Sequence, residues 1–599
     1  MDAMEQITTF GVTDYVVFAF MLGVSAAIGI YYRLTGGQQK TTQEYLLGDK
    51  NLPILPVAFS LMASFMSAIT LLGVSMENYT YGTQFVIINI SYGFGTPIAV
   101  YCFLPVFFKL QATSAYEYLQ LRFGLATRLV CSIAFSIQMI LYMGIVLYAP
   151  ALALSAVTSL SLLAAILSMG IVCTFYSTIG GMKAVITTDV FQSLLMFAAV
   201  FSIIIKAAID LGGLGEIWKI AEEGGRIEFF DFNPDPRVRH TFWSLTIGGM
   251  FTFLSLYACN QAQVQRLLTL RNLKASQRAL WLNWPILSCL SFSTSFAGLA
   301  IYSRFYKCDP VAEKKISSPD QLMPLFVVET MGLIPGLSGL FVAGLFSGSL
   351  STVSSALNSL AAVSLEDYIK PLFFSFKRRP LSEKASTILS KCLVLSYGML
   401  CLAFAFLAQS FGGVLQASLT IFGVVGGPLL GVFTLGMFIP IANQMGAVIG
   451  LVVSVMISLW IGFGGPKPPL PRLPVSTEGC LIDPNSTEVS SFTTILPTNT
   501  TASVEEDYFI LYELSYLWYV VIAFVITVVL GTLVSVLAHN RCGEWSRNNQ
   551  DPDLFCPFVA EWKRKSLRRK DNYTDGEVTL YELPVSCNGI LKHKEGNQE

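Results

Sequence analysis

The stretch AGLFSGSLSTVSSALNSLAAV, from Ala343 to Val363, indicates most directly how this chain folds. It belongs to a run apolar enough to cross a bilayer, yet a third of its residues carry hydroxyl groups. One or two hydroxyls in a membrane helix can bond back to the carbonyl four residues earlier. A cluster suggests a face turned to water, to an ion or to another helix. Its members are Ser347, Ser349, Ser351, Thr352, Ser354, Ser355 and Ser359.

Two of these hydroxyls are adjacent in sequence. The oxygens of Ser351 and Thr352 diverge by about 100° on an α-helix. They can still share one cation if backbone carbonyls from a second, broken helix complete the shell. This pattern predicts a sodium site, while packing of small residues between helices remains the alternative explanation of the segment alone.

The composition places the chain in a membrane. Of 599 residues, 53 % are hydrophobic and 13 % are charged, against about 25 % charged in soluble proteins. Long apolar runs recur along the chain, which predicts an all-α, multi-pass membrane protein. The net charge of −1 argues against a nucleic-acid partner. No nucleophile elbow, phosphate loop or zinc spacing stands outside the apolar runs, so an enzyme is disfavoured.

We expect about thirteen transmembrane helices. The positions of Lys and Arg in the connecting loops place the N-terminus outside and the C-terminus in the cytoplasm of a plasma-membrane protein. The transmembrane domain covers 1–537, and 538–599 forms a mostly disordered cytoplasmic tail. The expected spans are roughly 13–32, 54–76, 84–106, 127–153, 159–180, 185–208, 241–260, 280–303, 333–362, 391–409, 413–438, 443–463 and 514–537.

This topology makes 464–513 an extracellular loop. The loop holds two glycosylation sequons, at Asn485 and Asn499. Cys308 and Cys480 also fall outside the membrane on the same side, where they can form a disulfide.

The second span shows signs of a break. Its centre, from Ala63 to Thr70, is small and hydroxylated, and a broken helix in a membrane is tolerated where its free backbone groups line a cavity. Five spans later, Gly248 and Gly249 form a similar weak point. This spacing suits a five-plus-five inverted-repeat (LeuT-like) transporter core, with repeats at about 54–208 and 241–438.

Few ionisable groups lie within the spans. Asp14 and Asp189 stand near predicted span ends, where a partly solvated helix-end charge is the simpler interpretation. No Lys or Arg lies at a predicted midplane, so an anionic substrate needs hydroxyls, helix ends or bound sodium. Thr70, Tyr142 and Trp243 are the polar or aromatic candidates, although Tyr and Trp in spans often anchor at the interface instead.

Several long strings resemble one family. From about residue 10 to 537, the chain is similar to sodium:solute symporters of the group that includes the sodium-coupled monocarboxylate, multivitamin and iodide transporters. The family fold has thirteen helices around five-plus-five inverted repeats. The matching strings are TSAYEYLQLRFG (113–124), LYMGIVLYAPALAL (141–154), IGGMKAVITTDVFQ (179–192), RHTFWSLTIGG (239–249), CNQAQVQR (259–266), FSGSLSTVSSALNSLAAVSLEDYIKP (346–371) and GGPLLGVFTLGMFIP (426–440).

The resemblance also implies roles for particular residues. Asp189 matches a position linked to sodium release. The implied sodium ligands are the hydroxyls of Ser351 and Thr352 with the carbonyls of Ala63, Met66 and Gly348. The implied substrate or second-ion region comprises Ser67, Thr70, Tyr142 and Trp243.

The branch of the family sets the expected substrate. SFMSAIT (64–70) resembles the monocarboxylate branch, TSAYEYL (113–119) resembles the multivitamin branch, and Thr70 disfavours iodide. The string VSMENY (74–79) departs from the Pro-Ser-Glu-x-Tyr typical of the group. We therefore expect a sodium-coupled importer of short-chain acids such as lactate, butyrate or nicotinate, or of biotin and pantothenate. Sodium is the coupling ion and no cofactor is expected; an iodide-type symporter and a sodium-permeable channel or sensor are the alternatives.

Overall fold

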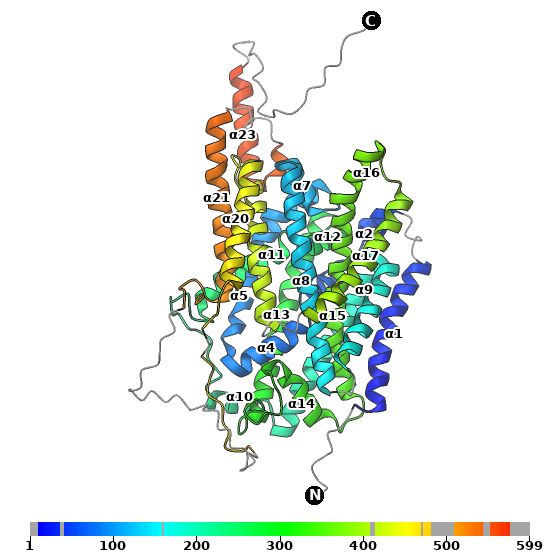
Figure 1. Cartoon of the computed structure of the whole chain (residues 1–599), viewed down its shortest axis with the longest axis vertical. Coiled ribbons are helices and arrows are strands. Elements are labelled where there is room, and N and C mark those ends of the chain that lie inside the picture. The colour runs from blue at the N-terminus through cyan, green and yellow to red at the C-terminus, as the bar shows by residue number, and fades with distance from the viewer. Residues whose placement is uncertain are drawn as a thin grey trace.

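The computed structural model describes residues 10–35, 41–157, 161–407, 414–468, 471–480, 508–542 and 551–574. Within these ranges the chain is helical, with no strand, and most of the long helices run side by side along the long axis (Figure 1). Such a bundle satisfies its backbone hydrogen bonds inside each segment, as a bilayer requires.

Long helices form much of the bundle, and shorter ones either complete further spans within it or lie at its two ends. The long ones are α1 (Val12–Thr35), α8 (Leu125–Val157), α9 (Leu162–Leu211), α13 (Leu273–Phe305), α15 (Leu337–Val363), α17 (Glu383–Leu407), α20 (Gln444–Phe463) and α21 (Tyr519–Cys542). The shorter ones are α2 (Thr42–Leu47), α3 (Ile54–Ala63), α4 (Ala68–Tyr81), α5 (Ile88–Ile98), α6 (Leu104–Leu110), α7 (Ala115–Arg122), α10 (Leu214–Glu223), α11 (Gly249–Tyr257), α12 (Gln261–Leu267), α14 (Leu322–Met331), α16 (Lys370–Lys377), α18 (Val414–Ile421), α19 (Gly427–Phe438) and α23 (Pro557–Thr574).

Among the described residues, ten helical stretches are long and apolar enough to cross a membrane, and the bent pair α3–α4 makes an eleventh. The 50 residues of α9 would measure about 75 Å as one helix, far more than the ~30 Å apolar core of a bilayer. Gly181 divides α9 with a φ of 64°. These features confirm an all-helical membrane fold, while the count of thirteen spans stays a prediction.

The predicted break in the second span is confirmed. The axes of α3 and α4 meet at 61°. Residues 64–67 separate them, and Ser67 caps α4 by accepting a hydrogen bond from the Ile69 N–H at 3.1 Å. A serine at this position satisfies one of the free N–H groups at the start of α4.

The expected break at Gly248 and Gly249 is wrong. Both glycines have helical dihedral angles, because a π-helical turn at Ser244–Gly248 leads directly into α11. The chain leaves the helix ten residues later, between Tyr257 and Gln261, where Asn260 caps α12 through the Ala262 N–H at 2.9 Å. A glycine pair permits a break without requiring one, whereas an N-cap side chain favours it.

The hydroxyl-rich helix α15 lies at the centre of the bundle. Every residue from Phe341 to Val363 is buried, and α15 packs against α9, α8 and α1. Some of its hydroxyls serve packing alone: Ser359 bonds to Ala356 of its own helix, and Ser349 to the Val146 carbonyl of α8. The packing interpretation therefore holds for these residues.

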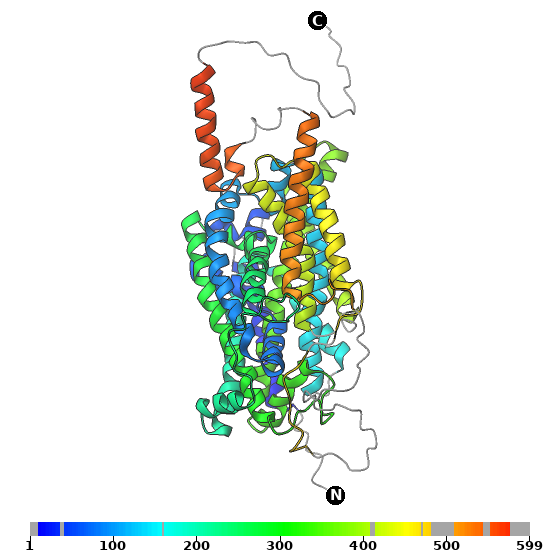
Figure 2. The same ribbon diagram turned by 90° about the vertical axis from the view of Figure 1, so that its left-hand side faces the viewer.

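The two ends of the bundle differ. The start of α1 lies at the same end as α10 and α14, while α7, α16 and α23 lie at the other (Figures 1 and 2). At the first end Cys308 and Cys480 form a disulfide. Asn485 and Asn499 lie outside the described residues.

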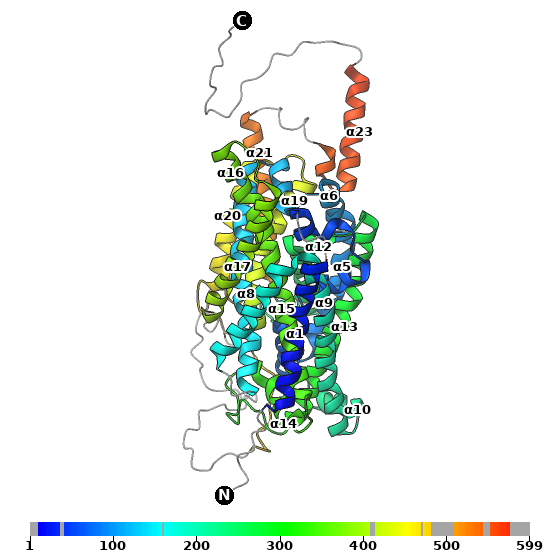
Figure 3. The same cartoon turned by 90° about the vertical axis from the view of Figure 1, so that its right-hand side faces the viewer.

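Part of the C-terminal segment, 551–574, contacts the bundle, while the mostly disordered tail expected over 538–599 stays a prediction. Phe555 is buried, the Cys556 N–H donates to the Met437 carbonyl at 3.0 Å, and the Tyr118 hydroxyl donates to the Leu554 carbonyl at 3.0 Å. Helix α23 then extends away from the bundle (Figure 3). The residues just before α23, Leu554 and Cys556, thus contact α7 and the end of α19.

The buried guanidinium of Arg122 at the end of α7 generates a stability prediction. It donates to the carbonyls of Gly436, Ile439 and Ala442 at 2.9, 2.9 and 3.1 Å, and so closes the turn between α19 and α20. Arg122→Met leaves these carbonyls unpaired. Each carbonyl that stays buried without a partner lowers the free energy of unfolding by about 1–3 kcal/mol. We expect a lower thermal unfolding temperature of the detergent-purified protein than for Lys109→Met, which removes an exposed charge. Equal unfolding temperatures of the two variants would contradict this role.

Candidate functional site

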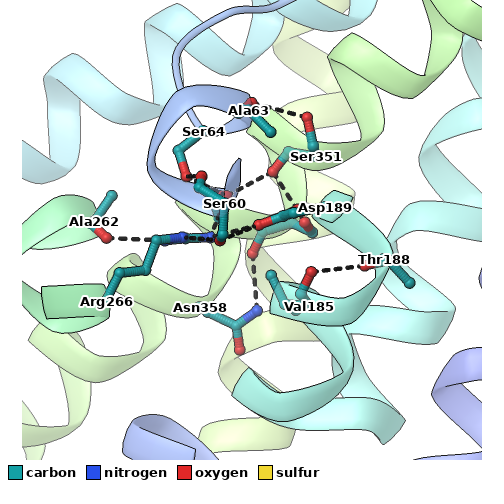
Figure 4. A network of polar contacts seen from close by, with 12 residues as sticks. Ser60, Ala63, Ser64, Val185, Thr188, Asp189, Ala262, Arg266, Ser351 and Asn358 are labelled. Atoms are coloured by element: carbon teal, nitrogen blue, oxygen red, sulfur yellow. Dashed lines mark hydrogen bonds and ion pairs between the residues drawn. The ribbon is translucent and has the colours of Figure 1, made fainter. Parts of the chain in front are cut away.

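The hydroxyls of Ser351 and Thr352 meet the broken second span. Ser351 Oγ donates to the Ala63 carbonyl at 2.8 Å, and Thr352 Oγ1 approaches the same oxygen at 3.3 Å (Figure 4). Both hydroxyls also lie 3.0 Å from the Gly348 carbonyl. Four of the five residues that the sequence assigned to sodium therefore lie together.

Local structure explains this meeting. Helix α3 ends at Ala63, so the Ala63 carbonyl lacks a helical N–H partner and can bind other groups. Gly348 allows α15 to approach the break, since a Cβ there would lie 2.9 Å from the Ala68 nitrogen. A side chain at position 348 would push the two spans apart.

The chemistry of this group suits a sodium ion. It presents two hydroxyl and two carbonyl oxygens, all uncharged, and hard cations prefer oxygen ligands. The described residues contain no cluster of three or more His, Cys, Asp or Glu side chains that would hold a transition metal. Met66 lies at the break, and its N–H donates a hydrogen bond to the Met62 carbonyl at 2.9 Å. The role of the Met66 carbonyl as a fifth sodium ligand stays a prediction.

A buried ion pair lies on the adjacent side of the break. Asp189 of α9 and Arg266 of α12 are both fully buried, with Oδ2 and Nη2 3.5 Å apart. Ser60 of α3 donates to Asp189 at 2.5 Å and accepts from Arg266 Nε at 2.8 Å. The expectation of a partly solvated Asp189 is therefore wrong, because Ser60 of α3 and Arg266 of α12 cover its carboxylate inside the bundle.

This pair connects to the sodium-site candidates through serines. Arg266 Nη2 donates to Ser355, whose Oγ lies 2.6 Å from the Ser351 carbonyl and 3.2 Å from Ser64 Oγ. Ser64 in turn donates to the Ser60 carbonyl at 2.6 Å. One hydrogen-bonded network thus joins α3, α9, α12 and α15 (Figure 4).

Sequence reasoning placed Arg266 in a cytoplasmic loop and so missed its role. The polar string CNQAQVQR (259–266) was the sequence signal for this buried position. It directly follows an apolar half-span, and a short polar helix at that depth fits only a protein-lined interior. The string supplies four buried polar side chains: Gln261, Gln263, Gln265 and Arg266.

An aromatic group lies beside the break on its other side. The ring of Phe65 is 6.5 Å from that of Tyr142, 6.0 Å from that of Tyr257 and 5.7 Å from that of Phe422. The Tyr142 hydroxyl interacts with the Ser67 side chain. Two of the predicted substrate residues, Ser67 and Tyr142, are therefore neighbours beside a buried cluster of aromatic rings.

The other two candidates differ in position. Thr70 is half-buried in the first turn of α4, with its N–H on the Ser67 carbonyl at 3.0 Å. Trp243 is 42 % exposed, and its indole N–H donates to the loop carbonyl of Phe232 at 3.2 Å. Trp243 precedes Tyr257 by fourteen residues, about 20 Å along a helix, so we exclude it from the group around Phe65 as a correction.

A broken span, a hydroxyl pair on a neighbouring buried helix and an interior ion pair together define an ion-coupled membrane transporter. Comparison with known proteins makes this class specific. The chain belongs to the sodium:solute symporter family, whose model matches residues 45–454.

Curated relatives match nearly the whole chain. A putative sodium-dependent multivitamin transporter of Drosophila melanogaster is 53 % identical, over 94 % of this chain and 93 % of its own. The sodium-coupled monocarboxylate transporter 1 of Homo sapiens is 47 % identical, over 92 % of this chain and 90 % of its own. The sodium-dependent multivitamin transporter of Oryctolagus cuniculus is 43 % identical, over 90 % of this chain and 84 % of its own.

A solved structure confirms the fold class. A sodium-coupled sialic acid symporter, in a substrate-bound outward-open state, superimposes with a TM-score of 0.72 at 25 % identity, covering 88 % of this chain and 98 % of its own. The fold is thus that of LeuT-like sodium symporters, as the sequence predicted. The proposed repeat boundaries, 54–208 and 241–438, stay a prediction.

The interior ion pair yields a second prediction. Arg266→Met leaves the Asp189 carboxylate buried without its cation, and breaking such a pair typically costs about 3–5 kcal/mol. The double variant Asp189→Asn/Arg266→Met removes both charges, so we expect its unfolding temperature in detergent to recover toward the wild-type value. Lys183→Met is the matched control, because its pair with Asp49 is partly exposed. A double variant no more stable than Arg266→Met would contradict the pairing.

Proposed function

We propose that this protein is a sodium-coupled symporter that imports small organic monocarboxylates. The observation that carries the proposal is the convergence of Ser351 and Thr352 on the free Ala63 carbonyl at the break between α3 and α4. A hydroxyl that donates to a carbonyl can rotate and offer its lone pair to a cation instead. A sodium ion at this position bridges α3 and α15, which lie in different predicted repeats.

Such a bridge provides the coupling. A ligand shifts an equilibrium between conformations only by its differential affinity for them. Sodium that needs ligands from both α3 and α15 favours the state in which the two helices are close. Each sodium ion that enters with the membrane potential adds about 2.3 kcal/mol per 100 mV.

The substrate is a small organic acid. The relatives' names refer to monocarboxylates in one branch and to vitamins in the other. Both branches fit the same site chemistry, because the Ser67 and Tyr142 hydroxyls can donate to a carboxylate while the Phe65 and Phe422 rings cover apolar carbons. Lactate, butyrate, nicotinate, biotin and pantothenate are the substrates to test, and no catalytic step or cofactor is required.

Orientation and location complete the proposal. The end of the bundle that holds α7, α16 and α23 carries the basic residues Lys377, Arg378 and Arg379 and the run from Lys563 to Lys565. Basic residues next to spans favour the cytoplasmic side. We place this end in the cytoplasm of a multi-pass plasma-membrane protein and the Cys308–Cys480 disulfide outside, where oxidising conditions maintain it. Asn485 and Asn499 then lie in the extracellular loop 464–513 as glycosylation sites.

Uptake measurements test the function directly. Cells expressing the protein are given labelled butyrate or biotin in sodium medium and then in choline medium, beside cells that lack it. We expect accumulation only with sodium. Uptake that persists in choline, or sodium current without accumulation of either acid, would replace symport with a facilitator or a channel.

The hydroxyl pair generates a third prediction. Ser351→Ala and Thr352→Ala each remove one oxygen ligand of a cation, and such an interaction is typically worth about 1.5–3 kcal/mol. We expect the sodium concentration for half-maximal uptake to rise roughly tenfold or more. Ser359→Ala on the same helix is the control, because this hydroxyl bonds only within α15. Sodium activation curves that match the wild type for both variants would show that the pair does not bind sodium.

A further inference from the structure

A second polar group lies on the α3 side of the aromatic group. The Leu61 carbonyl, one turn before the break, accepts the Gln263 side-chain N–H at 2.9 Å and the Tyr257 hydroxyl at 3.5 Å. Asn283 of α13 lies beside the Tyr257 hydroxyl. Three helices, α11, α12 and α13, therefore bring one polar side chain each to the Leu61 carbonyl of α3.

The amides in this group have unused hydrogen-bonding capacity. Asn283 and Gln263 are fully buried. The Asn283 amide interacts with the Tyr257 hydroxyl, and neither its oxygen nor the Gln263 oxygen has a hydrogen-bond partner among the described residues. Buried polar atoms are nearly always paired, so these two unpaired amide oxygens give the group unused capacity to bind a ligand.

The types of atom define the ligand chemistry. Asn283 offers N–H donors and one acceptor oxygen, and Gln263 adds a second acceptor oxygen. No charged side chain takes part in these contacts, and the group offers N–H donors as well as acceptor oxygens. A neutral amide or a ureido group, with both N–H and C=O, matches donors and acceptors together.

Its position links the group to the carboxylate end of the site. The Tyr257 ring lies 6.0 Å from the Phe65 ring, and Phe65 faces Tyr142, the neighbour of Ser67. The aromatic surface thus separates hydroxyls at one end from neutral amides at the other. A substrate with a carboxylate at one end of an apolar chain and an amide or ureido group at the other spans both.

We propose that Asn283 and Gln263 form a subsite that binds an uncharged amide or ureido group of the substrate, remote from its carboxylate. The inference rests on the carboxylate transport proposed above. It means that vitamin-like acids gain affinity at this end, while simple short-chain acids are held by the hydroxyl end and the aromatic surface alone.

A comparison of two substrates tests the subsite. Biotin carries a ureido group and butyrate carries none, so Asn283→Leu should raise the KM for biotin by about tenfold, as expected for one lost hydrogen bond in a buried site. The KM for butyrate should change less than twofold, with both values normalised to surface-labelled protein. Thr294→Val on the same helix is the matched control, because its buried hydroxyl already bonds to the Leu290 carbonyl.

The outcomes separate the two proposals. An equal change of KM for biotin and butyrate, or no change for either, overturns the subsite. Wild-type uptake of butyrate without biotin also overturns the subsite and leaves the proposed function standing. Wild-type protein without sodium-dependent uptake of any of the five acids overturns the proposed function itself. If Asn283→Leu does not reach the surface, Asn283→Ser is measured, and the same difference between biotin and butyrate is expected.

Discussion

The structure depends on the backbone groups released where the second span breaks. In a bilayer, a free carbonyl must find a partner inside the protein. At Ala63 the partners are two hydroxyls of α15, and at Leu61 they are side chains of α11 and α12. The break therefore creates both polar regions of the site, and the neighbouring helices are arranged around it. This explains why α15 is buried along most of its length although it is rich in serine.

The buried ion pair of Asp189 and Arg266 connects helices around the same break. Burying two charges is costly unless they are paired and further hydrogen-bonded. Arg266 meets this condition through Asp189, Ser60, Ser355 and the Ala262 carbonyl. Because these partners belong to α3, α9, α12 and α15, separation of any one helix leaves a charge or a donor unpaired. The network thus holds the half of the broken span that ends at the sodium-site carbonyl.

Sequence reasoning reached the elements whose signal is local. The broken second span follows from a small, hydroxylated stretch inside an apolar run, and the pair Ser351 and Thr352 is adjacent in the chain. It failed where the outcome depends on distant segments. The glycines at 248 and 249 stay helical because a π-turn continues into α11, and Arg266 is buried because three other helices supply its partners. The segment after residue 551 likewise makes contacts with α7 and α19 that no local pattern records.

The separation of neutral and charged groups is consistent with transport rather than storage of an ion. A transported ion must bind well enough to enter and weakly enough to leave. The oxygens around Ser351 and Ala63 are uncharged, and the nearby Asp189 carboxylate is already held by Arg266 and Ser60. A free carboxylate directly on the hydroxyl pair would bind a cation more tightly and slow its release. Because Asp189 is paired with Arg266 and Ser60, only uncharged oxygens of α3 and α15 would face an ion at the proposed sodium site.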